Sequence, residues 1–167
     1  MPRTYEPIAS VTLGADNVTA ATFTSIPATY TDVVLMLVGA MDTNHASILC
    51  RVNGDTASNY SGTYLAGSFS AVAQSYRESN LAFARLGGAV SYGALANEQF
   101  TIMSQFPSYA NTNVYKTILS APAQSYEVGR IVALWRSTSA INQIQVYHPV
   151  AKFKSGFTCS LYGIKAA

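Results

Sequence analysis

The chain has 167 residues, which is the length of about one domain, and only 11% of them are charged, against about a quarter in a typical soluble protein. A formal net charge of +2 and scattered Lys and Arg residues exclude the basic footprint of a nucleic-acid binder, and no apolar run reaches the ~20 residues of a membrane helix. So few charges predict that much of the surface lies against other protein surfaces.

Apolar residues alternate with a period of two through nearly the whole chain, and no window of a dozen residues shows a helical repeat. The run 31–40 is continuously apolar, which predicts a strand covered on both faces. The last predicted strand ends close to residue 164, and we expect it to lie inside a sheet. The predicted strands lie, in chain order, at 8–13, 18–23, 31–40, 46–53, 98–106, 114–121, 128–135, 141–148 and 156–164.

About eight to ten short strands joined by turns predict an all-β fold. We expect one domain over residues 1–167, an antiparallel β-sandwich of the jelly-roll kind. Residues 54–80 show little pattern and are expected to form a long loop. Cys50 and Cys159 each stand in an alternating apolar segment, so buried thiols are favoured over a disulfide.

The stretch VNGDTASNYSGTY, at 52–64, is the part of the chain that most resembles a site. Its Asn-Gly pair directly follows a strand and predicts a tight turn, because Gly and Asn accept a positive φ. A single carboxylate is too few for a calcium loop. Beyond the turn, aromatic residues alternate with small polar ones, and two interpretations stay open: a contact surface for a partner, or a core strand capped by tyrosines. The candidate contact residues are Asn53, Asp55, Asn59, Tyr60, Tyr64 and Phe69.

No catalytic, cofactor or metal site is predicted. The eight carboxylates are scattered, and the chain has neither a G-x-S-x-G elbow nor a glycine-rich phosphate loop before a helix. His45 and His148 lie at strand ends, where we expect solvated side chains, and two cysteines with two distant histidines give no metal spacing. A glycan-active hydrolase on the same scaffold would need two carboxylates that converge in space.

Five segments together carry a resemblance to a known family: YEPIASVTLG, FTSIPATYTDVVLMLVG, RVNGDTASNYS, VGRIVALWRSTSAINQIQV and FTCSLYGIKAA. In this order, and over nearly the whole chain, they resemble a group of small β-sandwich virion structural proteins of tailed bacteriophages. The resemblance implies a non-enzymatic virion component without a cofactor, assembled in the host cytoplasm and placed on the virion surface. It implies no catalytic role for the matching residues 53–55, 59–61 and 135–137, and Trp135 is expected in the core.

Within that class the first hypothesis is a capsid decoration or cement protein that forms a homotrimer and contacts the major capsid protein. The alternative is a tail-fibre or receptor-binding appendage that contacts tail proteins and recognises host-surface glycans through 54–80. In both hypotheses the expected partners are copies of the chain and other virion proteins, with neither a nucleic acid nor a membrane.

Overall fold

The computed structural model describes residues 5–15, 19–43, 46–68, 73–88, 98–125 and 127–165. Within these ranges the chain forms strands joined by turns and loops, and no helix there could cross a membrane. The strands are β1 (Tyr5–Thr12), β2 (Ala20–Phe23), β3 (Asp32–Gly39), β4 (Ile48–Val52), β5 (Tyr60–Ser68), β6 (Ala73–Leu81), β7 (Ala84–Gly87), β8 (Phe100–Pro107), β9 (Lys116–Gln124), β10 (Glu127–Trp135), β11 (Ile144–Tyr147) and β12 (Thr158–Ile164).

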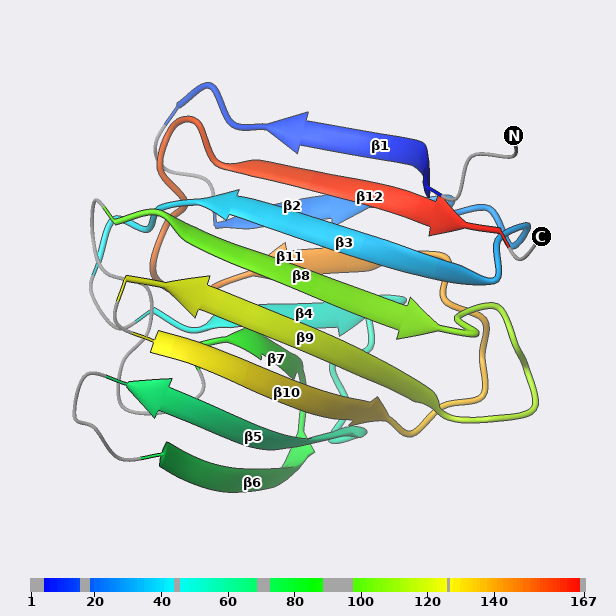
Figure 1. Ribbon diagram of the computed structural model, residues 1–167. Coiled ribbons are helices and arrows are strands. Elements are labelled where there is room, and N and C mark those ends of the chain that lie inside the picture. The colour runs from blue at the N-terminus through cyan, green and yellow to red at the C-terminus, as the bar shows by residue number, and fades with distance from the viewer. Residues whose placement is uncertain are drawn as a thin grey trace.

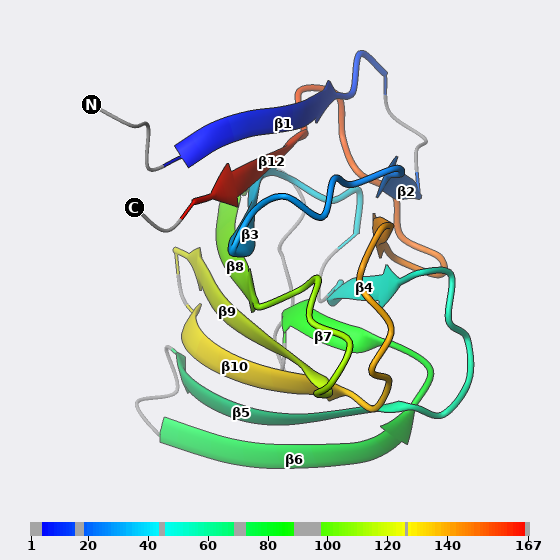
Figure 2. The ribbon, with the colours of Figure 1, turned by 90° about the vertical axis from the view of Figure 1, so that its right-hand side faces the viewer.

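The described strands form two antiparallel sheets. The larger sheet has eight strands in the order β1-β12-β3-β8-β9-β10-β5-β6, and the smaller has four in the order β2-β11-β4-β7. Figures 1 and 2 show the larger sheet curving around the smaller one, so that one face of each points into the space between them. This arrangement confirms the predicted all-β sandwich and is compatible with the jelly-roll architecture.

The expected long loop at 54–80 is wrong. Strand β5 and most of β6 lie in this range, and β7 follows at Ala84–Gly87. The sequence hides these strands because Ser, Gly and Ala, which are weak strand formers, occupy many of their positions. β5 pairs with β10, residue by residue, from Ser68 opposite Glu127 to Tyr60 opposite Trp135.

The last strand, β12, lies inside the larger sheet, as the sequence predicts. It pairs with β1 on one side and with β3 on the other, where Leu161 is opposite Leu35. Because both sides of β12 are hydrogen bonded, its removal would separate β1 from the rest of the sheet.

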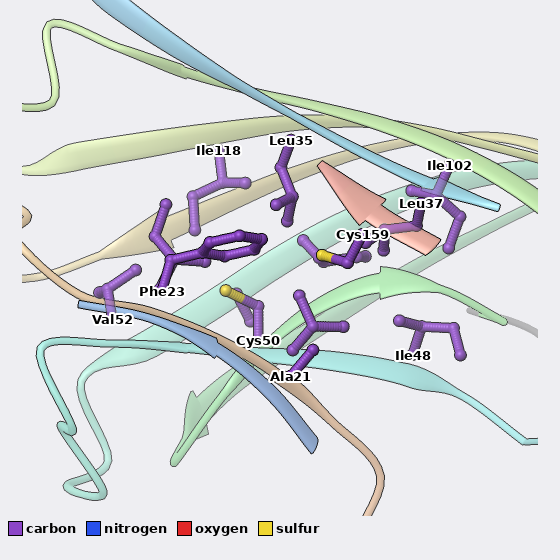
Figure 3. Packing of buried hydrophobic residues seen from close by; sticks show 14 of the residues in the cluster. Ala21, Phe23, Leu35, Leu37, Ile48, Cys50, Val52, Ile102, Ile118 and Cys159 are labelled. Atoms are coloured by element: carbon purple, nitrogen blue, oxygen red, sulfur yellow. The ribbon is translucent and has the colours of Figure 1, made fainter. Parts of the chain in front are cut away.

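The core fills the space between the two sheets (Figure 3). Phe23, Ile48 and Cys50 reach into it from the smaller sheet, and Leu35 and Ile118 are among the residues that enter it from the larger one. Cys159, on β12, is also buried in this core, and both cysteines are free thiols, which confirms the prediction for them.

Strand β3 departs from the expectation that both of its faces are covered. Its inward residues Val33, Leu35 and Leu37 are buried, and so is Val34, but Met36 remains 38% exposed on the opposite face. The apolar run therefore forms two different surfaces. One packs against the smaller sheet, and the other, at Met36, is partly exposed to solvent.

Candidate functional site

The turn at Asn53 and Gly54 has the predicted conformation, with φ of 53° and 67°. The Asn53 side chain is used inside the molecule, because its amide donates to the carbonyl of Ala140 at 2.8 Å. Its Oδ1 accepts from the backbone N–H groups of Asn142 at 2.9 Å and Gln143 at 3.1 Å. These bonds tie the β4–β5 turn to the segment before β11, so Asn53 has a structural role.

Asp55 connects the same turn to the end of β10. Its Oδ2 accepts from the indole N–H of Trp135 at 2.6 Å and from the Asn59 amide at 2.9 Å, and its Oδ1 accepts from the Ala57 N–H at 2.8 Å. Partial burial raises the pKa of Asp55, but the hydrogen bonds from Asn59, Trp135 and Ala57 outweigh it and hold the pKa below its ordinary value. Trp135 is buried, as predicted.

The tyrosines of the candidate stretch lie inside the protein. Tyr60 is fully buried, donates its hydroxyl toward the carbonyls of Val52 and Asp55, and stacks on Trp135 with ring centroids 6.4 Å apart. Tyr64 is 1% exposed. The core-strand interpretation therefore describes both residues, and the contact role predicted for them is corrected: their rings do not reach the surface. Phe69 lies outside the described residues.

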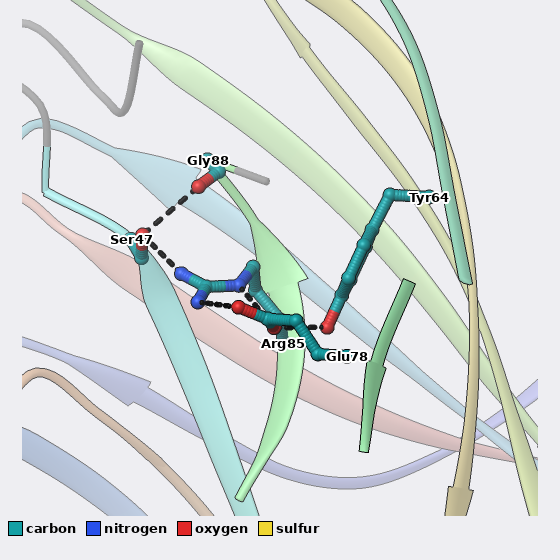
Figure 4. A network of polar contacts seen from close by, with 5 residues as sticks. All are labelled: Ser47, Tyr64, Glu78, Arg85 and Gly88. Atoms are coloured by element: carbon teal, nitrogen blue, oxygen red, sulfur yellow. Dashed lines mark hydrogen bonds and ion pairs between the residues drawn. The ribbon is translucent and has the colours of Figure 1, made fainter. Parts of the chain in front are cut away.

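Tyr64 belongs to a polar network between the two sheets (Figure 4). Its hydroxyl donates to Glu78 Oε2 at 2.6 Å, and Arg85 Nη2 contacts Glu78 Oε1 at 2.9 Å. Arg85 Nη1 also donates to the Ser47 hydroxyl, which donates in turn to the carbonyl of Gly88 at 2.9 Å. The network thus connects β5 and β6 of the larger sheet with β7 and the start of β4.

The electrostatics of this network stabilise the contact between the two sheets. Burial and the neighbouring Glu78 carboxylate raise the pKa of Tyr64, so its phenol stays protonated. Burial raises the pKa of Glu78, yet the hydrogen bonds from Arg85 and Tyr64 prevail and lower it. A phenol that is kept protonated can donate a hydrogen bond but cannot take a proton from a substrate near neutral pH.

Two further basic side chains have structural roles, because both form hydrogen bonds with backbone groups. Lys116 is 1% exposed, its Nζ donates to the carbonyls of Val114 at 2.8 Å and Thr138 at 3.1 Å, and burial lowers its pKa. His148 Nδ1 accepts from the backbone N–H groups of Val150 and Ala151, at 3.1 and 2.7 Å. Within the described ranges, no three His, Cys, Asp or Glu side chains gather as metal ligands.

The surface feature that sequence reasoning missed is the outer face of the larger sheet, the face turned away from the smaller sheet. Burial alternates along β8 and β10, and the outward positions include large apolar side chains. Val132 is 49% exposed and Leu65 56% exposed. We call the following set the apolar patch: Met36, Leu65, Met103, Leu119, Val128 and Val132, with Arg130 among them.

The pairing register brings these side chains together across neighbouring strands. Met36 is opposite Met103, which is opposite Ala121, so one row crosses β3, β8 and β9. A second row runs from Leu119 to Val132 across β9 and β10. The patch is therefore one continuous surface, although its residues come from five strands.

Open hollows flank the outward side chains of β10. One, of about 330 Å³, is lined by Met103, Gln105, Leu119, Arg130 and Val132. Another, of about 380 Å³, lies on the β5 side between Leu65, Val128 and Arg130. The sequence does carry a trace of this face, because the outward positions of 98–106 and 128–135 are apolar or neutral except for Arg130, where a solvated sheet face usually has several charges.

Comparisons with known proteins give distant likenesses in structure. No family model and no curated protein matches the chain. The solved alginate lyase Aly36B aligns with 93% of this chain and 79% of its own at 9% identity and a TM-score of 0.39. The PL-14 alginate lyase from Aplysia kurodai aligns at 8% identity over 80% of this chain and 71% of its own, with a TM-score of 0.27. A protein of unknown function from Shewanella oneidensis MR-1 aligns over 98% of this chain and 71% of its own at 11% identity, with a TM-score of 0.23.

These comparisons correct the functional expectation. The hypotheses of a non-enzymatic capsid decoration protein and of a tail appendage are contradicted, because the similar solved structures named first are alginate lyases, which are enzymes. At 9% identity and a TM-score of 0.39, the likeness assigns neither that activity nor that substrate to this chain. The resemblance to a virion protein family and the location on a virion surface stay predictions.

Proposed function

We propose that the chain is a self-associating subunit, and that the apolar patch on the outer face of its larger sheet packs against the same patch of a second copy. The observation that supports this proposal is the exposure of six large apolar side chains on one sheet face. Contiguous apolar patches of several hundred Å² are rare on solitary soluble proteins and mark contact surfaces.

The size of the patch fits a stable contact. Five strands spaced about 4.8 Å apart, each with about seven residues at about 3.4 Å per residue, cover roughly 550 Å² in projection. Two copies that meet face to face would bury roughly 1,100 Å², which exceeds the ~1,000 Å² expected of a biological interface.

The composition of the patch also fits a protein partner. Protein interfaces are enriched in Met and Arg and depleted in Lys, Asp and Glu at their centres. Here Met36 and Met103 lie opposite each other, Arg130 is the charged side chain among them, and the neighbouring outward positions Thr63 and Ala121 are neutral. The patch contains no aromatic ring on which a sugar could stack, so these residues favour a second copy over a glycan.

Symmetry makes the proposal specific about stoichiometry. A face that meets itself across a two-fold axis gives an isologous pair, whereas the trimer predicted from the sequence needs contact between two different surfaces. The proposal therefore predicts a particle whose mass is an even multiple of 17.8 kDa.

The test measures this mass by light scattering and sedimentation velocity for the wild type, V132K and V150K. Lysine at position 132 would place an ammonium group in the apolar contact, and we expect the mass to halve. Val150 is 78% exposed and lies outside the larger sheet, so V150K is the matched control and should keep the wild-type mass. Thermal melts check that both variants fold. A wild type that stays at 17.8 kDa at high concentration, or a V132K variant with the wild-type mass, overturns the proposal.

A further inference from the structure

The two sheets end in four edge strands, and three of these are poorly suited to accept another strand. β2 and β7 have four residues each. β1 contains Pro7, and its pairing with β12 is irregular between Pro7 and Ala9. Short strands, prolines and bulges all discourage further pairing at an edge.

β6 is different. It has nine residues without a proline, and among the described strands it pairs with β5 alone. Its register with β5 is regular from Ala73 to Glu78 and shifts between Glu78 and Leu81. Charged side chains often protect an edge, but Glu78 is turned toward Tyr64 and Arg85 and is bound by both. Arg77 remains as the free charge of the strand, opposite Thr63 of β5. One side of β6 therefore offers regularly spaced backbone donors and acceptors from Ala73 to Glu78.

We infer that β6 of one copy pairs antiparallel with β6 of a second copy, about a two-fold axis that passes at Tyr76. This contact uses the edge of the sheet and goes beyond the face contact proposed above. Directly opposite residues of an antiparallel pair point to the same side of the sheet. Three registers pair most of the nine residues of β6 with its copy and keep the outer faces of the two sheets on the same side. They differ in the residue that lies at the two-fold axis, opposite its own copy: Tyr76, Arg77 or Glu78.

Charge selects among these registers. Arg77 opposite Arg77, or Glu78 opposite Glu78, puts like charges together and destabilises the pair. The register through Tyr76 places Arg77 opposite Ser75 of the second copy and Glu78 opposite Gln74, with no like charges in contact. Tyr76 is 52% exposed and already stacks on Tyr64 with ring centroids 6.2 Å apart, so pairing at Tyr76 would align four tyrosine rings.

Disulfide trapping tests this register. The native thiols are buried and should not cross-link, so the wild type is the negative control. Y76C and R77C are oxidised mildly, and the dimer band is followed on a non-reducing gel. In the inferred register, the two thiols of Y76C face each other. The two thiols of R77C are offset by two residues, beyond the ~7 Å that a disulfide spans between Cα atoms. We expect Y76C to cross-link at least about tenfold faster than R77C.

The same oxidation in the V132K background separates this inference from the proposed function. Y76C should cross-link with Val132 or Lys at position 132, because V132K does not change a residue of β6. This expectation does not depend on whether V132K alters the mass of the particle. Equal rates for Y76C and R77C indicate random collision, and a faster R77C indicates another register. Either result, or no cross-link in either variant, overturns the inference.

A second pair of variants tests the register without cysteines. Q74E would place a carboxylate opposite Glu78 of the second copy and should weaken the dimer that remains in V132K. Q74K would place an ammonium group there and should preserve it. If both changes weaken the dimer equally, or neither does, Gln74 does not face Glu78 and the register is wrong.

Discussion

Trp135 donates its indole N–H to Asp55 at 2.6 Å, across 80 positions of the sequence. The bond joins the end of β10 to the turn that follows β4, and so connects the larger sheet to the smaller one. Asp55 also accepts from Asn59 and from the Ala57 N–H, which makes it the acceptor for three donors. A turn that looks like a ligand loop in the sequence is therefore occupied by bonds within the chain.

The D55A variant should unfold more easily than the wild type. It leaves the Trp135 indole and the Asn59 amide without their acceptor, and unpaired donors of this kind cost about 2–4 kcal/mol together. D55N retains one amide oxygen and should cost less, while T56A, at an exposed neighbouring position, is the matched control. Urea denaturation measures the three free energies of unfolding. A D55A variant as stable as T56A would show that the three bonds contribute nothing.

The contribution of Asp55 should depend on pH in one direction. Its pKa is lower in the folded protein than its ordinary value, so the folded state holds the proton less tightly than the unfolded state does. The stability that Asp55 adds is therefore complete above the unfolded pKa and is lost as the pH falls through the folded pKa. We expect the difference in unfolding free energy between wild type and D55N to be constant down to about pH 5 and to shrink as the pH falls below about 4. A difference that stays constant below about pH 4 would contradict the lowered pKa of Asp55.

The thiols of Cys50 and Cys159 should be unreactive in the native protein. Burial raises the pKa of Cys50 to about 12, and burial and the neighbouring Cys50 raise that of Cys159 as well. They lie on strands of opposite sheets, which pack about 10 Å apart, so a disulfide between them would require the backbone to move. A thiol reagent at about pH 8 should label neither cysteine in the native protein and both in denaturant, where the pKa returns to about 8.5. Rapid native labelling would mean that the core opens locally.

Alternation in the sequence predicts the sandwich and most of its strands because half-buried strands repeat with a period of two. It fails at β5 and β6, where Ser, Gly and Ala outnumber the usual strand formers, and where burial of Tyr64 depends on a partner strand distant in sequence. The buried thiols, the Asn53 turn and the inner position of β12 could be predicted, because each depends on local pattern.

The sequence could not show which of the candidate contact residues are buried and which are exposed. A Tyr that alternates with small polar residues looks the same in sequence whether its ring points inward or outward, and only the pairing of β5 with β10 shows that Tyr60 faces the core. The apolar patch depends on register across five strands, which places Met36 beside Met103. That register is set by long-range pairing, and no local window of the sequence contains it.

The network of Tyr64, Glu78 and Arg85 should contribute to stability through the ion pair more than through the phenol. Arg85 and Glu78 are 16% and 18% exposed, so E78Q leaves a partly buried guanidinium without its counter-charge, and we expect a loss of about 1–3 kcal/mol. Y64F removes one donor while Arg85 still holds the carboxylate, so its cost should be about 1 kcal/mol. The double variant tests whether the two residues act together: if they do, its loss is smaller than the sum of the single losses. Chemical denaturation of the three variants at neutral pH gives these values, and an E78Q loss below that of Y64F would reverse the assigned order, because the ion pair would then contribute less than a single hydroxyl.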